Sequence, residues 1–299
     1  MTPVLPQQNI LILGVSGMLG GALFSSLPAF GKNYTVFGTY RGQSLTPTLN
    51  KHMHLLKLDD VFNKNALLQI LTEHKIDVVI NAIGLIKQIG GELSKSDFVR
   101  INAWLPHYLM ELCDKVGARF VEISTDCVFT GQKGNYSEDD IADARDIYGL
   151  TKLLGEITEN KNALTIRTSI IGHESGRAAS LVDWFLSQSG EVKGFRKAIF
   201  SGFPTSYLAE IMGKYILPNS ELNGLYHVSA NPIDKFSLLS LVADSYQHDI
   251  KLIPNDELVI DRSLNSSRFK AATGFITPEW PELIDIMKSN RPVWTQNEH

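Results

Sequence analysis

The chain has 299 residues, of which 43% are hydrophobic and 20% are charged, and its formal net charge is −4 at pH 7. These values are ordinary for a globular protein and allow a large core, in one extended α/β domain or in a domain with an added lobe. Lysine and arginine are scattered and form no basic stripe, which argues against nucleic-acid binding. Two cysteines, Cys113 and Cys127, cannot build a disulfide framework, so we expect a reducing, cytoplasmic setting.

The segment 10–27 is uncharged and apolar enough to resemble a signal peptide or a membrane span. However, it contains four glycines, and no basic residue precedes it. A buried strand, a glycine-rich turn and a helix explain this segment better. We therefore expect neither a targeting sequence nor membrane association.

The first half of the chain alternates short apolar runs with helical patterns, which predicts βα units around a parallel sheet. In chain order, the predicted elements are a strand at 10–13, a helix at 18–27, strands at 34–39 and 54–58, a helix at 63–74, a strand at 78–83, a helix at 98–116, a strand at 119–124, a loop at 130–145, a helix at 148–159 and a strand at 164–168. Beyond residue 170 the alternation weakens, and helices are predicted at 179–187, 206–217 and 236–245. The expected fold is a Rossmann-type doubly wound sheet in residues 1–170 and a smaller mixed substrate-binding lobe in 171–299, with segments such as 203–217 returning to the first half.

Three glycines follow the first predicted strand and open the first predicted helix. Gly14 permits a tight turn, Gly17 lets a phosphate approach the backbone, and Gly20 lets the helix lie close to the sheet. This pattern predicts a site for the pyrophosphate of a dinucleotide, formed by Gly14, Ser16, Gly17, Met18, Leu19 and Gly20. The alternative is a tight strand–helix turn that binds no ligand.

The end of the second predicted strand indicates which dinucleotide is bound. An NAD site usually places an acidic residue about 20 positions after the glycines. Here residues 38–42 read Gly-Thr-Tyr-Arg-Gly, and the guanidinium of Arg41 suits a 2′-phosphate. We therefore predict NADP(H) in preference to NAD(H), with a solvated surface arginine as the alternative. Asp59, after the third strand, either accepts from the adenine amine or caps the next helix.

Tyr148 and Lys152 are four residues apart and lie on one face of a predicted helix. A free phenol has a pKa near 10, and a nearby ammonium lowers that pKa by favouring the phenolate. The same ammonium could hold the nicotinamide ribose. Thr125 lies at the carboxyl end of the predicted strand 119–124, where open α/β sheets bind ligands, and is our candidate to bind the substrate oxygen. An exposed tyrosine–lysine pair is the alternative.

Five stretches carry a resemblance to a known family. They are 124–129 (STDCVF), 148–156 (YGLTKLLGE), 166–169 (IRTS), 203–205 (FPT) and 261–269 (DRSLNSSRF). They resemble the extended short-chain dehydrogenase/reductases, and among these the nucleotide-sugar reductases related to dTDP-4-dehydrorhamnose reductase. The resemblance implies transfer of a hydride from NADPH to a keto carbon, most typically C4, of a nucleoside-diphosphate 6-deoxy-hexose. It also implies that Tyr148 protonates the alkoxide, that Thr125 binds the carbonyl oxygen, and that Asn81, Ala82, Ile83 and Gly84 line the cofactor.

Some features depart from the family pattern or leave alternatives open. Cys127 stands where the rhamnose enzymes usually have tyrosine, which leaves the sugar undecided. Related 4,6-dehydratases have glutamate at this position, and a cysteine cannot replace that acid, which argues against dehydration. Lys87, Arg196 and Arg262 are candidates to neutralise the substrate diphosphate, and solvated surface charges are their alternative.

Two other functions stay open at this stage. One is an epimerase or epimerase/reductase that recycles a tightly held nicotinamide. The other is a non-catalytic regulatory subunit of the same fold, against which the intact Thr125, Tyr148 and Lys152 argue. We predict no metal site, and a homodimer is possible through the apolar surfaces of helices 98–116 and 148–159.

Overall fold

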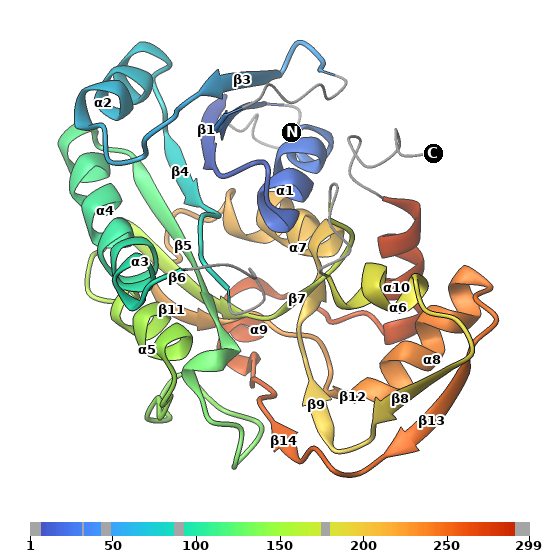
Figure 1. The fold of residues 1–299 in the computed structure, drawn as a ribbon. Coiled ribbons are helices and arrows are strands. Elements are labelled where there is room, and N and C mark those ends of the chain that lie inside the picture. Colours follow the sequence, from blue (N-terminus) through green and yellow to red (C-terminus); the bar gives the residue numbers. More distant parts are fainter. Residues whose placement is uncertain (1–6, 32, 43–48, 87–92, 175–179, 291–299) are drawn as a thin grey trace.

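A parallel sheet of seven strands forms the centre of the molecule in the computed structural model, which describes residues 7–31, 33–42, 49–86, 93–174 and 180–290. Its strands lie in the order β11-β6-β5-β4-β1-β2-β3 (Figure 1). They are β1 (Gln8–Leu13), β2 (Tyr34–Tyr40), β3 (Met53–Lys57), β4 (Val78–Asn81), β5 (Arg119–Thr125), β6 (Ala163–Thr168) and β11 (Gly224–His227). The order reverses beside β1, so the prediction of a Rossmann-type doubly wound sheet is confirmed.

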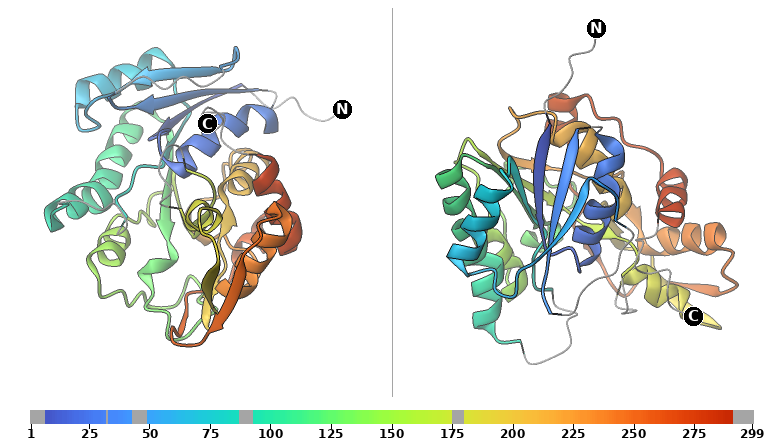
Figure 2. Two further views of the ribbon diagram at one scale, coloured as in Figure 1. Left: turned by 45° about the vertical axis from the view of Figure 1, so that its right-hand side comes forward. Right: turned by 90° about the horizontal axis from the view of Figure 1, so that it is seen from above.

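Helices cover both faces of this sheet, as Figure 2 shows from above. Helices α1 (Met18–Phe30) and α7 (Thr205–Ile211) pack together on one face. Helices α2 (Lys64–Glu73) and α4 (Leu105–Val116) pack together on the other. The side chains of β1 alternate between these layers, since Ile10 and Ile12 join the first core cluster and Leu11 and Leu13 the second. Burial on both faces explains the continuous apolar run of β1.

The apolar segment 10–27 is accounted for by β1, the glycine turn and most of α1. In the described parts of the chain, every helix is too short or too polar to cross a bilayer.

Several predicted boundaries differ from the structure, for example the helix predicted at 206–217, which is α7 followed by a π-helical turn at Met212–Ile216, and three elements near the site. The strand predicted at 78–83 ends at Asn81, because the Asn81 side chain accepts a hydrogen bond from the Ile83 N–H at 3.2 Å and turns the chain. The helix predicted at 98–116 is instead α3 (Lys95–Phe98), a π-helical turn at Val99–Trp104, and α4. The helix predicted at 148–159 is α5 (Ile147–Leu154), which ends before Gly155.

The second half of the chain builds a lobe of short strands and helices. It contains β7 (Ile170–Ile171), α6 (Leu181–Leu186), β8 (Glu191–Phe195), β9 (Ala198–Phe200), β10 (Phe203–Pro204), a π-helical turn at Met212–Ile216, β12 (Ile233–Asp234), α8 (Lys235–Tyr246), β13 (Lys251–Asn255), β14 (Ile260–Asp261), α9 (Ser267–Thr273) and α10 (Trp280–Ser289). Helix α7 packs against α1, and β11 extends the main sheet beside β6. The division of the chain near residue 170 stays a prediction.

The surface named above for self-association carries exposed apolar side chains. Val99 and Trp104 lie in the π-helical turn before α4, and Leu150 and Leu154 lie on α5; all four are exposed. A homodimer through this surface stays a prediction.

His227 on β11 makes stability depend on pH. Its side chain is fully buried, its Nδ1 lies 2.9 Å from the Tyr136 carbonyl oxygen, and Arg167 lies beside its Nε2 at 3.4 Å. Burial, and then the charge of Arg167, lower the pKa of His227 from 6.5 to about 4. Between pH 6.5 and 4 the imidazole is protonated in the unfolded chain and neutral in the folded chain. The contribution of neutral His227 to the free energy of unfolding is therefore fully present above pH 6.5 and is lost as the pH falls toward 4.

We expect the free energy of unfolding of the natural chain to fall by about 2 kcal/mol more than that of His227→Gln between pH 6.5 and 4.5. Urea denaturation of both proteins at the two pH values measures this difference. Equal losses in the two proteins would show that His227 does not cause the acid sensitivity.

Candidate active site

The predicted glycine turn joins β1 to α1 with little space around it. Gly14 has a φ of +88°, which favours glycine, and its N–H donates to Thr39 Oγ1 at 3.3 Å. A Cβ atom on Gly20 would lie 2.2 Å from the Gly14 carbonyl oxygen, so α1 packs directly on the turn. A Cβ atom on Gly17 would lie 3.4 Å from the same oxygen, which is near ordinary contact.

The N-terminus of α1 has the properties of an anion site. Gly17 is the N-cap, no described side chain caps the helix, and its first turn has no acidic residue. Ser16 and Gly17 are exposed, whereas Leu19 is buried in the core, so Leu19 can offer a ligand only its backbone. A 13-residue helix that begins with uncapped N–H groups fits a pyrophosphate.

The loop after β4 borders this turn. Ala82 N–H donates to the Leu13 carbonyl oxygen at 3.1 Å, and a Cβ atom on Gly14 would lie 2.9 Å from Ile83 Cγ1. Asn102, fully buried in the π-helical turn, holds the loop by two hydrogen bonds to the Leu85 backbone, at 2.8 and 2.9 Å. Sequence analysis missed Asn102, since its partner is distant in the chain.

Arg41 and Asp59 follow two neighbouring strands, β2 and β3, and both are exposed. Asp59 accepts from the Gly42 N–H at 3.4 Å and pairs with Lys57 at 3.3 Å. The alternative that Asp59 caps the following helix is wrong, because Asn63 is the N-cap of α2 and accepts from Ala66 N–H at 3.1 Å.

Thr125 and Tyr148 meet at the carboxyl end of the sheet. Thr125 ends β5, and Tyr148 lies in the first turn of α5, for which Asp146 is the N-cap. A Cβ atom on Gly149 would lie 2.3 Å from the Cys127 carbonyl oxygen, so this turn packs on the end of β5. Thr125 Oγ1 donates to Asp126 Oδ1 at 3.2 Å and accepts from the Cys127 N–H at 3.2 Å. Burial raises the pKa of the Tyr148 phenol, and the neighbouring Thr125 side chain acts against this rise.

The net shift of the Tyr148 pKa is opposite to the one expected from the sequence. Burial raises the pKa of the phenol above its usual value of 10, and the neighbouring acidic groups of Cys127, Asp126 and Asp146 act in the same direction. The expectation that Lys152 makes this phenol more acidic is therefore wrong for the structure described. Tyr148 holds its proton firmly at neutral pH.

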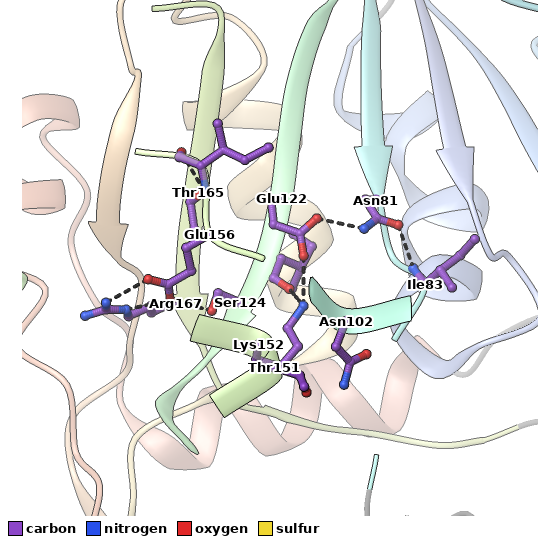
Figure 3. Close-up of polar contacts among 12 residues, drawn as sticks. Asn81, Ile83, Asn102, Glu122, Ser124, Thr151, Lys152, Glu156, Thr165 and Arg167 are labelled. Carbon is purple, nitrogen blue, oxygen red and sulfur yellow. Dashed lines mark hydrogen bonds and ion pairs between the residues drawn. The ribbon is translucent and has the colours of Figure 1, made fainter. Parts of the chain in front are cut away.

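Lys152 is paired with a buried carboxylate that sequence analysis missed. Its Nζ donates to Glu122 Oε1 at 2.8 Å and to the Ile123 carbonyl oxygen at 2.7 Å (Figure 3). Glu122 lies on β5, and its Oε2 accepts from Asn81 Nδ2 at 2.7 Å. A carboxylate between the apolar residues Val121 and Ile123 of a buried strand was the available signal, because a buried carboxylate needs a partner.

The predicted substrate residues have different environments. Arg262 Nε donates to the Phe129 carbonyl oxygen at 2.8 Å, and its Nη1 lies 3.6 Å from Cys127 Sγ, so this arginine lies beside the end of β5. Arg196 is paired with Asp256 on the surface, at 2.6 Å. Lys87 lies outside the described residues. Among the described residues, no group of three or more His, Cys, Asp or Glu side chains could hold a metal ion.

Residues 8–287 match the family described as the RmlD substrate binding domain. The chain belongs to this family. Among curated relatives, dTDP-4-dehydrorhamnose reductase of Aggregatibacter actinomycetemcomitans is 29% identical over 65% of this chain and 71% of its own length. Spore coat polysaccharide biosynthesis protein SpsK of Bacillus subtilis is 29% identical over 75% of this chain and 74% of its own. Methionine adenosyltransferase 2 subunit beta of Bos taurus is 24% identical over 81% of this chain and 73% of its own length.

Solved structures of several other proteins are similar to this chain. A hypothetical dTDP-4-dehydrorhamnose reductase of Sulfolobus tokodaii matches with a TM-score of 0.72 and 27% identity, over 91% of this chain and 98% of that one. The Bacillus anthracis dTDP-4-dehydrorhamnose reductase in complex with NADP matches with a TM-score of 0.74 and 21% identity, over 95% and 99%. Bordetella bronchiseptica WbmG in complex with NAD and UDP matches with a TM-score of 0.75 and 14% identity, over 95% of this chain and 94% of that one. The last two show similarity of fold alone.

Proposed function

We propose that this RmlD-family protein reduces the C4 keto group of a nucleoside-diphosphate 6-deoxy-hexose with NADPH. The observation that carries the proposal is the contact between Thr125 and Tyr148 at the carboxyl end of the sheet. The uncapped N-terminus of α1 and the loop after β4 meet at the glycine turn that follows β1, a central strand of the same sheet. The relatives named as dTDP-4-dehydrorhamnose reductases support the same substrate class.

The described residues have separate tasks in this reaction. The backbone around Gly14 and Gly17 would hold the pyrophosphate, and Arg41 the 2′-phosphate. NADPH, when bound, supplies the hydride. Thr125 donates a hydrogen bond to the ketone oxygen, and Tyr148 transfers its phenolic proton to the alkoxide as it forms.

The raised pKa of Tyr148 keeps the phenol in the protonated form that reduction needs. A buried phenol remains protonated through neutral pH, which is the form that an acid needs before the hydride arrives. Proton transfer is still downhill, because an alkoxide is a much stronger base than a phenolate. Oxidation of the alcohol would need the phenolate, which burial disfavours.

The function is tested by mixing the purified protein with NADPH and a dTDP-4-keto-6-deoxy-hexose. We expect the absorbance of NADPH to fall, and the amount of NADPH oxidised to equal the amount of sugar reduced. An isomerised sugar without net consumption of NADPH would instead identify an epimerase.

A second candidate function is a non-catalytic regulatory subunit. Its support is the similarity to methionine adenosyltransferase 2 subunit beta over 81% of this chain. Such a protein would bind the nicotinamide and the nucleotide sugar without oxidising NADPH. The intact Thr125, Tyr148 and Lys152 favour the enzyme.

Replacing Arg41 by alanine tests the cofactor preference. We expect the ratio of kcat/KM for NADPH to that for NADH to fall about tenfold, because a charge-assisted contact to the 2′-phosphate is lost. Lys57→Ala is the control, since Lys57 is an exposed cation on the neighbouring strand, paired with Asp59. If Arg41→Ala does not change the ratio of the two kcat/KM values, Arg41 is a solvated surface residue that does not bind the 2′-phosphate.

A further inference from the structure

We propose that Glu122 is a positioning residue of this site, because its carboxylate joins the Lys152 ammonium to the loop that borders the cofactor. The inference rests on the proposed function, since it assigns the lysine and the loop to one nicotinamide site. Glu122 itself touches neither substrate nor cofactor in this account. It acts through Lys152 on one side and through Asn81 on the other.

The contacts form one continuous chain of hydrogen bonds, of which the two made by Glu122 are buried (Figure 3). Glu122, with a side chain 1% exposed, accepts from Lys152 Nζ at 2.8 Å and from Asn81 Nδ2 at 2.7 Å. Asn81 Oδ1 in turn accepts from the Ile83 N–H at 3.2 Å. The chain therefore links helix α5 to the loop after β4 through a residue of β5, the strand between them.

The direction of every hydrogen bond in this chain depends on the carboxylate. Lys152 and the Asn81 amide both donate, and only a group with two acceptor oxygens satisfies both. A glutamine at position 122 would offer one acceptor and one donor. The NH2 group of that glutamine would then face another donor, either the Lys152 ammonium or the Asn81 NH2. Rotating the Asn81 amide would remove the second clash, but it would place the Asn81 NH2 opposite the Ile83 N–H, which is also a donor. Neutralising Glu122 thus disturbs the cofactor loop as well as the lysine.

The ion pair also leaves Lys152 with a defined free donor. An ammonium has three N–H groups, and two of them are used by Glu122 and the Ile123 carbonyl oxygen. The third is available to a ribose hydroxyl. Because these two hydrogen bonds hold the Lys152 side chain in one rotamer, the ammonium is in position before the cofactor binds.

The decisive comparison uses Glu122→Gln, the double variant Glu122→Gln/Asn81→Asp and the control Glu156→Gln. Glu156 is matched, because its side chain is 4% exposed and pairs with Arg167 at 2.8 Å. Two quantities are measured: the Kd for NADPH by fluorescence titration, and the thermal stability of each variant. The Kd needs no turnover, so it reports on the site independently of the substrate.

For Glu122→Gln we expect a Kd about tenfold higher than that of the natural chain. In the double variant a carboxylate at position 81 accepts from the new amide and from the Ile83 N–H. The Kd should therefore return to within about threefold of the natural value. Glu156→Gln should lower thermal stability and leave the Kd unchanged.

A Glu122→Gln variant that behaves like Glu156→Gln would reduce Glu122 to a structural ion pair and overturn the proposal. Should Glu122→Gln fail to fold, Asn81→Ala decides, because it keeps the Glu122–Lys152 pair and breaks only the link to the loop. Weaker NADPH binding in that variant supports the proposal, and unchanged binding contradicts it. If the natural chain binds NADPH but reduces no nucleotide sugar, the proposed function fails and the Kd comparison still judges Glu122. No binding of NADPH at all would overturn both.

Discussion

Tyr148→Phe is expected to lower kcat for ketone reduction about a thousandfold while changing the Kd for NADPH less than about threefold. The phenol is the only group in our account that gives a proton to the alkoxide. The substitution removes that proton and leaves the ring in place. Steady-state rates and fluorescence titration of the same preparation separate the two effects.

Tyr136→Phe is the matched control for this experiment. Tyr136 is also largely buried, and its hydroxyl accepts from the Lys133 N–H at 3.0 Å, in the loop between β5 and α5. We expect its kcat to stay within about threefold of the natural value. A Tyr148→Phe variant that keeps a tenth or more of the activity would mean that another group, or water, supplies the proton.

Two glycines of the turn after β1 should respond differently to alanine. In Gly20→Ala the new methyl would lie 2.2 Å from the Gly14 carbonyl oxygen, a backbone atom that cannot move aside cheaply. We expect a loss of about 3 kcal/mol in the free energy of unfolding, or failure to fold. In Gly17→Ala the methyl lies 3.4 Å from the same oxygen, so we expect stability within about 0.5 kcal/mol of the natural chain.

Binding of NADPH should also respond to the alanine at position 17. The methyl of Gly17→Ala projects at the exposed N-cap of α1, where the pyrophosphate would approach, so the Kd for NADPH should rise about a hundredfold. Urea denaturation and fluorescence titration measure the two effects. If Gly17→Ala binds NADPH normally, the pyrophosphate does not approach the turn as we infer, although the fold would be unaffected.

The sheet was predictable because its signals are local. Residues 10–13 of β1 are apolar because each is buried against one layer of helices or the other, and the glycines after them mark a place where α1 approaches the strand closely. Helix α5 was predicted too long for a non-local reason. A Cβ atom on Gly155 would lie 2.1 Å from the Asn102 carbonyl oxygen, a contact between segments that are about fifty residues apart in the sequence.

The site was predicted in part. The residue types and their places after strands sufficed to find Thr125 and Tyr148, which the structure brings together. The i, i+4 spacing placed Lys152 on the face of Tyr148 but could not indicate where its long side chain would go. That direction is decided by Glu122, and the shift of the Tyr148 pKa is decided mainly by burial, neither of which a spacing can reveal.

In the proposed reaction, a sugar ketone bound at this site receives a hydride from NADPH and a proton from Tyr148. This reaction is tested most directly with NADPH that carries deuterium at C4 of the nicotinamide, on the face that transfers. After incubation with a dTDP-4-keto-6-deoxy-hexose, we expect one deuterium on the carbinol carbon of the product and an equal amount of NADP⁺. A nucleotide sugar that is bound or isomerised without deuterium, with the NADPH unconsumed, would contradict the account.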